Sequence, residues 1–147
     1  MATFNKILCP VDFDDNSMNA LTLAIDLARQ NNAKIYLLHV VPPMDPLIVS
    51  APIVFARDQE RARAELEKVA GKYLSGVDHE VVQRVGHAAA EIVAAIGAVG
   101  ADLVVMATHG RKGVSHLVLG SVAEKVVRES LCPVLTVRAK HAAQMAA

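Results

Sequence analysis

Met106-Ala107-Thr108-His109-Gly110 leads a buried strand into a glycine-bearing loop, and Gly120-Ser121-Val122 begins a helix after that loop. The apolar run 103–107 is typical of a parallel strand that is buried on both faces, and residues 121–130 carry apolar side chains at the spacing of one helix face. Unpaired N–H groups and the positive end of the helix dipole stabilise an anion at such a helix start. The stretch therefore predicts an α/β fold with a candidate phosphate site. The same residues also fit ordinary turn glycines, with Ser121 as a helix N-cap.

Outside this stretch, short apolar runs alternate with longer amphipathic runs. Strands are expected at 6–11, 34–41, 80–85, 103–107 and 133–137, and helices at 17–30, 55–74, 88–99 and 121–130. The alternation predicts a single α/β domain over residues 1–147, in which helices cover both faces of a parallel sheet and residues 140–147 form a loose tail. The most polar strand, 80–85, is expected at an edge of that sheet.

Four segments together resemble the universal stress protein family, and the resemblance covers essentially the whole chain. They are Lys-Ile-Leu-Cys-Pro-Val-Asp at 6–12, Leu-Leu-His-Val at 37–40, the Met-Ala-Thr-His-Gly loop at 106–110, and Cys-Pro-Val-Leu-Thr-Val at 132–137. Nucleotide-binding members of that family carry Gly-x-x-Gly-x9-Gly-Ser/Thr, and the corresponding positions here are Ala107, Gly110, Gly120 and Ser121. Ala107 adds one methyl group where the family's backbone approaches the ligand, and we expect this change to be tolerated.

The resemblance implies a Rossmann-like five-stranded parallel sheet of order 3-2-1-4-5 with an adenine nucleotide at the carboxyl ends of its strands. In such a sheet the helices that follow strands one and four cover opposite faces and open a crevice between those strands. The implied contacts are Val40 at the adenine edge, Pro10, Val11 and Asp12 near adenine and ribose, and Met106, Ala107, Gly110, Gly120, Ser121 and Val122 around ribose and phosphates.

Two of these assignments have alternatives. Asp12 is suited to accept hydrogen bonds from ribose hydroxyls, but a carboxylate at that position also caps the turn at 14–16. His109, Arg111 and Lys112 lie in the phosphate loop and are further candidates for screening phosphate charge, although surface loops often carry such residues for solubility alone.

The function implied by the resemblance is that of a cytoplasmic, homodimeric protein that acts as a nucleotide-responsive regulatory or protective module in the stress response. The expected ligand is ATP, with or without magnesium, and AMP and ADP are expected to bind more weakly. One alternative is a slow ATPase or self-phosphorylating enzyme that uses Ser121 or a neighbouring hydroxyl. The other is a dimeric interaction module that needs no nucleotide.

Composition and motifs argue against several other classes. Fifteen basic and fifteen acidic residues balance, and no basic run suggests a nucleic-acid partner. No apolar stretch approaches the roughly 18 residues of a membrane span, and no signal core precedes the first strand, so a cytoplasmic protein is the default.

The six histidines form no i, i+4 pair and the two cysteines have no cluster around them, so no metal site is expected. Both cysteines are interpreted as buried free thiols. We identify no catalytic residue, because both a Walker A loop and a Gly-x-Ser-x-Gly elbow are missing.

Two apolar segments require a cover. Residues 42–53 hold four of the six prolines together with several large aliphatic residues, and they are expected to pack either as a lid beside the adenine site or against a second subunit. The fifth strand, Pro133 to Val137, would expose apolar residues at a sheet edge. The family resemblance supplies a cover for it, namely antiparallel pairing with the same strand of a second copy.

Overall fold

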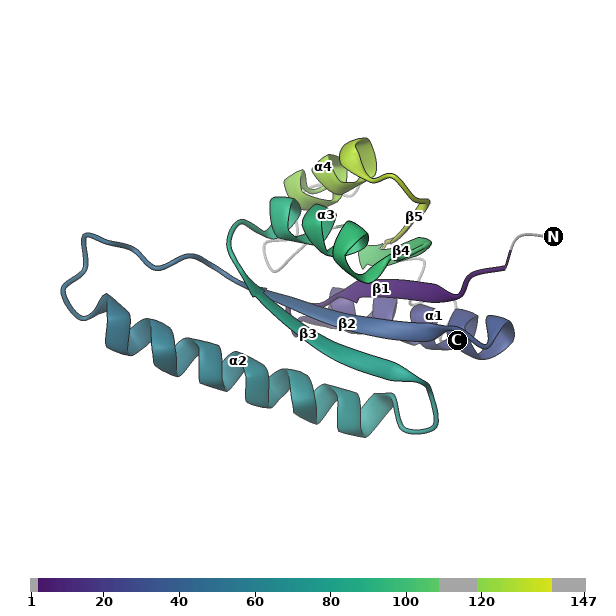
Figure 1. Ribbon diagram of the computed structural model, residues 1–147, viewed down its shortest axis with the longest axis horizontal. Coiled ribbons are helices and arrows are strands. Elements are labelled where there is room, and N and C mark those ends of the chain that lie inside the picture. The colour runs from purple at the N-terminus through teal and green to yellow at the C-terminus, as the bar shows by residue number, and fades with distance from the viewer. Residues whose placement is uncertain (1–2, 109–118, 139–147) are drawn as a thin grey trace.

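The computed structural model describes residues 3–108 and 119–138, which form a parallel sheet of order β3-β2-β1-β4-β5 with helices on both faces (Figure 1). This is the predicted fold class and strand order. The elements are β1 (Lys6–Pro10), α1 (Asp15–Asn31), β2 (Lys34–Val41), α2 (Ala51–Tyr73), β3 (His79–Val85), α3 (Ala88–Val99), β4 (Leu103–Ala107), α4 (Ser121–Glu129) and β5 (Val134–Val137).

Alternate residues of the central strands feed two separate apolar cores. Ile7 and Cys9 of β1 face a core shared with α1 and α2, while Leu8 between them faces a second core shared with α3 and α4. All three side chains are fully buried. The helices that follow β1 and β4 therefore cover opposite faces of the sheet, and the carboxyl ends of these two strands form the switch point that the strand order predicts.

Most element bounds agree with the sequence to within one residue, and the exceptions have local causes. The first helix begins at Asp15, two residues before the expected start, because the side chain of Asp14 caps it by accepting from the N–H of Ser17 at 2.7 Å. The second helix begins at Ala51, four residues before the expected start, since Pro52 falls in its first turn, where a missing N–H costs no helical hydrogen bond.

Residues 42–54, named here the β2–α2 arm, extend beyond the sheet (Figure 1). The turn of the arm is held locally, because the Asp45 side chain accepts from the N–H of Leu47 at 2.9 Å. Leu47 is 89% exposed, Val49 is fully exposed and Ile53 is 64% exposed. Within the described chain the arm is thus not packed as a lid, and packing against a second copy remains a prediction.

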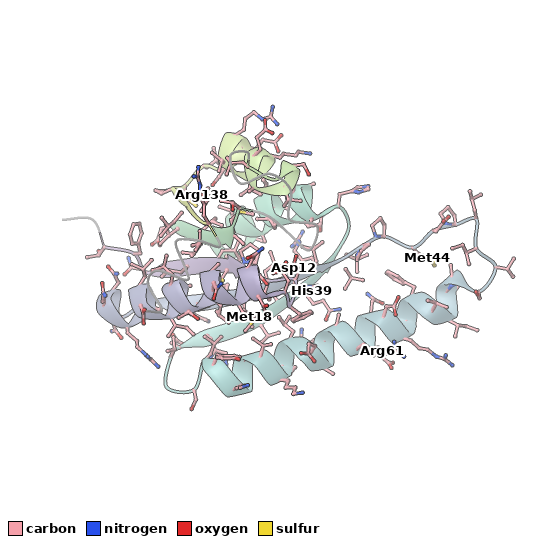
Figure 2. All side chains as sticks on the ribbon, turned by 180° about the vertical axis from the view of Figure 1, so that it is seen from behind. Asp12, Met18, His39, Met44, Arg61 and Arg138 are labelled. Atoms are coloured by element: carbon pink, nitrogen blue, oxygen red, sulfur yellow. The ribbon has the colours of Figure 1, made fainter. Side chains whose placement is uncertain are left out.

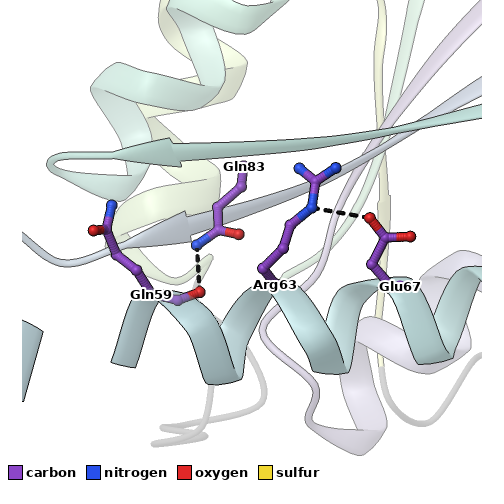
Figure 3. A network of polar contacts seen from close by, with 4 residues as sticks. All are labelled: Gln59, Arg63, Glu67 and Gln83. Carbon is purple, nitrogen blue, oxygen red and sulfur yellow. Dashed lines mark hydrogen bonds and ion pairs between the residues drawn. The ribbon is translucent and has the colours of Figure 1, made fainter. Parts of the chain in front are cut away.

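Helix α2 lies along β3, the predicted edge strand. The Gln83 side chain of β3 donates to the backbone carbonyl of Gln59 at 3.0 Å, and Arg63 pairs with Glu67 one turn further along α2 at 3.0 Å (Figure 3). Leu66, Val69 and Ala70 are the residues by which α2 joins the core. The charged residues of α2 are mostly exposed, as its sequence pattern predicts.

Candidate functional site

The segments predicted to form the site meet at the carboxyl ends of β1, β2 and β4. Parallel pairing aligns Pro10 with Leu38, and the N–H of Val11 donates to the carbonyl of Leu38 at 2.8 Å, so the register continues past the end of β1. Asp12 follows directly after Val11, whose carbonyl oxygen lies within hydrogen-bond distance of the His39 ring of β2; Figure 2 labels both Asp12 and His39. On the other side of β1, strand β4 ends at Ala107.

Asp12 belongs to a hydrogen-bonded turn that begins α1. Its N–H donates to the Ser17 hydroxyl at 3.2 Å, and its carboxylate accepts from the N–H of Asp14 at 3.3 Å. The Ser17 hydroxyl in turn donates to the carbonyl of Asp14 at 3.1 Å. The capping alternative for Asp12 is therefore present in the structure, and a ribose contact has to use the remaining acceptor capacity of the same carboxylate.

The turn concentrates negative charge at this end of the site. Burial, and next the hydrogen-bonded Asp14 carboxyl, raise the pKa of Asp12 above its ordinary value. The Oδ2 atom of Asp14 is buried, and it has no hydrogen-bond partner among the residues that the structure describes. A group with hydroxyl donors suits this end of the site, whereas a phosphate would be repelled by it.

Phe13 and His39 support the same turn, and sequence reasoning missed both roles. Phe13 has a φ of 69°, in the left-handed region that a bulky residue rarely adopts. Its ring lies against the His39 ring with 4.6 Å between centroids, and Nδ1 of His39 lies 2.8 Å from the carbonyl oxygen of Val11. Since a carbonyl only accepts, Nδ1 carries the proton in this contact. The sequence feature that could have indicated the role of His39 was its position as a polar residue within an apolar strand.

The other end of the site is the start of α4. Gly120 is the N-cap, with φ −60° and ψ 157°, and no side chain among the residues that the structure describes caps the helix here. Ser121 is the first helical residue and is exposed, so the alternative of Ser121 as N-cap is wrong. Because φ −60° is open to any residue, the backbone conformation does not require glycine at position 120. Glycine there leaves the first-turn N–H groups uncovered where serine or aspartate would cover them.

Thr108 ties this helix start to the sheet. Its carbonyl accepts from the N–H of Gly120 at 2.8 Å, and its own N–H donates to the carbonyl of Val137 at 3.1 Å. Thr108 is buried, and its hydroxyl also lies 3.4 Å from the Val137 carbonyl. Sequence reasoning did not single out Thr108, although a polar residue directly after a buried strand was the signal.

The remaining predicted residues approach the site in different ways. The side chains of Val11 and Met106 are buried in the two cores, so only their backbones can meet a ligand. Val40 and Val122 are partly buried on the α3 and α4 face.

Ala107 ends β4 opposite Val137, and its φ is not positive, so its methyl group causes no backbone strain. Pro10 is partly buried at the end of β1, while His109, Gly110, Arg111 and Lys112 lie outside the described residues.

The described residues hold no cluster of three metal-ligating side chains. None of their helices combines the length and the apolar character that a membrane span needs.

Comparisons with known proteins agree in sequence and in fold. The universal stress protein family matches residues 3–138. Universal stress protein MJ0531 of Methanocaldococcus jannaschii is 31% identical over 142 residues, covering 92% of this chain and 82% of that protein. Universal stress protein YxiE of Bacillus subtilis is 32% identical over 149 residues, covering 92% and 99%.

Solved structures with the same architecture include hypothetical protein MJ0577, which aligns with a TM-score of 0.82 at 27% identity over 93% of this chain and 97% of that chain. A universal stress protein in complex with cAMP aligns with a TM-score of 0.69 at 26% identity, covering 93% and 98%.

Proposed function

The chain belongs to the universal stress protein family, and from that premise we propose that it binds ATP across the carboxyl ends of β1, β2 and β4. Its role is then that of a nucleotide-responsive regulatory or protective module. Val40 supplies backbone groups to the adenine edge, Asp12 accepts from the ribose, and the Gly120 to Val122 helix start receives phosphate. His109, Gly110 and Arg111 complete the phosphate loop in this proposal.

The uncapped start of α4 is the observation that carries the proposal. Gly120 leaves first-turn donors without a side-chain cap, and its carbonyl accepts from Glu124 at 2.9 Å as the first helical bond. These donors and the helix dipole stabilise an anion at this position. The cAMP complex of a relative at 26% identity supports an adenine nucleotide as the source of that anion.

The charges at the two ends of the site support one direction for the proposed nucleotide. The paired carboxyls of Asp12 and Asp14 disfavour phosphate and suit ribose hydroxyls, while the start of α4 favours phosphate. The nucleoside therefore lies at the β1–β2 end and the phosphate chain runs toward α4. ATP is expected to bind more tightly than AMP, because only ATP places outer phosphates at the helix start and the loop.

Mass spectrometry of ligand released from freshly purified protein, followed by calorimetry with ATP and AMP, tests the proposal. We expect one ATP per chain and weaker binding of AMP. Absence of both heat and thermal shift with either nucleotide would contradict it.

A further inference from the structure

A concave site lies outside the proposed nucleotide site, between α1 and α2. It is a pocket of about 220 Å³, lined by Phe13, Met18, Glu65, Lys68, Val69, Lys72 and Tyr73. Met18 projects from α1 toward α2 (Figure 2). In the same view it lies below Asp12, which follows β1, and His39 of β2. The pocket belongs to the α1 and α2 face of the sheet, whereas the start of α4 belongs to the other face.

The floor of this pocket is apolar and structurally fixed. Val69 is buried, and Phe13 and Met18 pack against the same core from its margin. Phe13 holds its place in the left-handed conformation, which a bulky residue keeps only where its surroundings enforce it. The contact of its ring with His39 is one such constraint. This apolar floor is already formed before a ligand binds, which lowers the entropic cost of binding.

The rim of the pocket carries a positive pair. Lys68 and Lys72 are one turn apart on α2, and among the ion pairs of the described residues neither lysine has a carboxylate partner. The Lys72 ammonium lies 5.2 Å from the centre of the Tyr73 ring, and Tyr73 is 40% exposed at the edge. Glu65 offsets one of the two charges, so the lining has a net charge of about one positive unit.

We propose that this pocket binds a small amphipathic monoanion, namely a carboxylate with an aromatic or branched aliphatic body. The body contacts Phe13, Met18 and Val69, and the carboxylate pairs with Lys68 and Lys72. The volume fits a ligand about the size of a substituted benzene ring with a short acid side chain, smaller than the roughly 300–1,000 Å³ of sites for larger ligands. Nothing in this assignment depends on nucleotide binding.

Fluorine NMR of 4-fluorophenylacetate with the full-length protein tests the proposal. An affinity on the order of 1 mM is expected for a ligand of this size. The double variant Lys68→Glu with Lys72→Glu should weaken binding at least about fivefold, since it turns a favourable charge into a repulsive one. 4-Fluorophenethylamine, with the same ring and the opposite charge, should bind the wild type more weakly than the acid does.

The matched control is the double variant Arg57→Glu with Arg61→Glu. These two residues have the same spacing on the same helix and the same charge change, but they do not line the pocket. Unaltered binding by this control, with loss in the lysine variant, supports the proposal, and melting curves check that both variants fold. Equal weakening in both variants, equal binding of the acid and the amine, or absence of binding to the wild type would overturn it.

Discussion

The backbone N–H of Gly120 donates to the carbonyl oxygen of Thr108 at 2.8 Å, which joins the start of α4 to the end of β4 although residues 109–119 separate them. Thr108 also donates to Val137, so one buried residue connects β4, β5 and α4. The position of the helix start is thereby set by the sheet, and a phosphate held there would be placed relative to β1 as well.

Gly120→Val is expected to abolish ATP binding and to leave the sheet folded. The branched side chain occupies the space where phosphate would approach the backbone, whereas φ −60° and ψ 157° are accessible to valine. Calorimetry with ATP measures the loss, and far-ultraviolet circular dichroism checks the fold.

Ala107→Gly is the companion variant, with affinity expected to be equal or better because it removes one methyl group at the first position of the glycine pattern. Normal ATP binding by Gly120→Val would show that the phosphates lie elsewhere.

Asp12→Asn is expected to stabilise the protein at neutral pH. Burial and the Asp14 carboxyl raise the pKa of Asp12 above its ordinary value of 3.8, so the folded chain holds a proton there more tightly than the unfolded chain does. Stability conferred by Asp12 should therefore fall as the pH rises from about 3.8 through the raised pKa, and the loss is complete above it. Asparagine still accepts from Asp14 and carries no charge.

Urea unfolding at a series of pH values measures this effect, with Asp26→Asn on the exposed side of α1 as the control. The same Asp12→Asn variant should bind ATP more weakly if the carboxylate accepts from ribose. Lower stability than wild type at pH 7 would mean that the Asp12 charge is compensated in the fold.

The two cysteines are expected to differ in reactivity. Cys9 is fully buried, and burial raises its thiol pKa to about 12, so it holds almost no thiolate in the native state. Cys132 is only partly buried, and its Sγ atom lies 3.5 Å from the Ser130 hydroxyl oxygen. The prediction that both cysteines are buried is therefore correct for Cys9 and only partly correct for Cys132. An Ellman titration should therefore find one reactive thiol per native chain and two after denaturation.

Cys132→Ser should remove the rapid phase of this titration, and Cys9→Ser should leave it unchanged. Rapid labelling of Cys9 in the native protein would show that β1 opens far more readily than its packing indicates.

Hydrophobic pattern predicted the elements well because strands such as Leu103–Ala107 are buried on both faces and leave little choice of structure. The strand order came from the family resemblance, since pattern alone does not choose among parallel topologies. The local details of the site were beyond such reasoning. The left-handed conformation of Phe13 and the hydrogen bond from Gly120 to Thr108 depend on contacts between residues that lie apart in the sequence, as between Phe13 and His39. Local helix and strand propensities contain no information about these contacts.

The open edge of β5 is expected to pair with the same strand of a second copy. The carbonyls of Pro133 and Val137 accept from Val104 and Thr108 of the neighbouring strand and its extension, so they face β4. Because backbone groups alternate in direction along a strand, the N–H and the carbonyl of Thr136 face the open edge. Leu131 is fully exposed and Leu135 is 38% exposed, and an apolar interface requires such residues.

Thr136→Pro is therefore the selective test of this assembly. It removes an N–H that β4 does not use, so the monomer fold should survive while pairing across the edge is lost. In analytical ultracentrifugation we expect a wild-type dimer and a shift of Thr136→Pro toward folded monomer.

Leu47→Ser in the β2–α2 arm should leave the dimer intact if the contact is made through β5. A wild-type protein that stays monomeric at high micromolar concentration would contradict the strand pairing. Loss of the dimer in Leu47→Ser alone would assign the contact to the arm instead, because the arm is the other large apolar surface of the described chain.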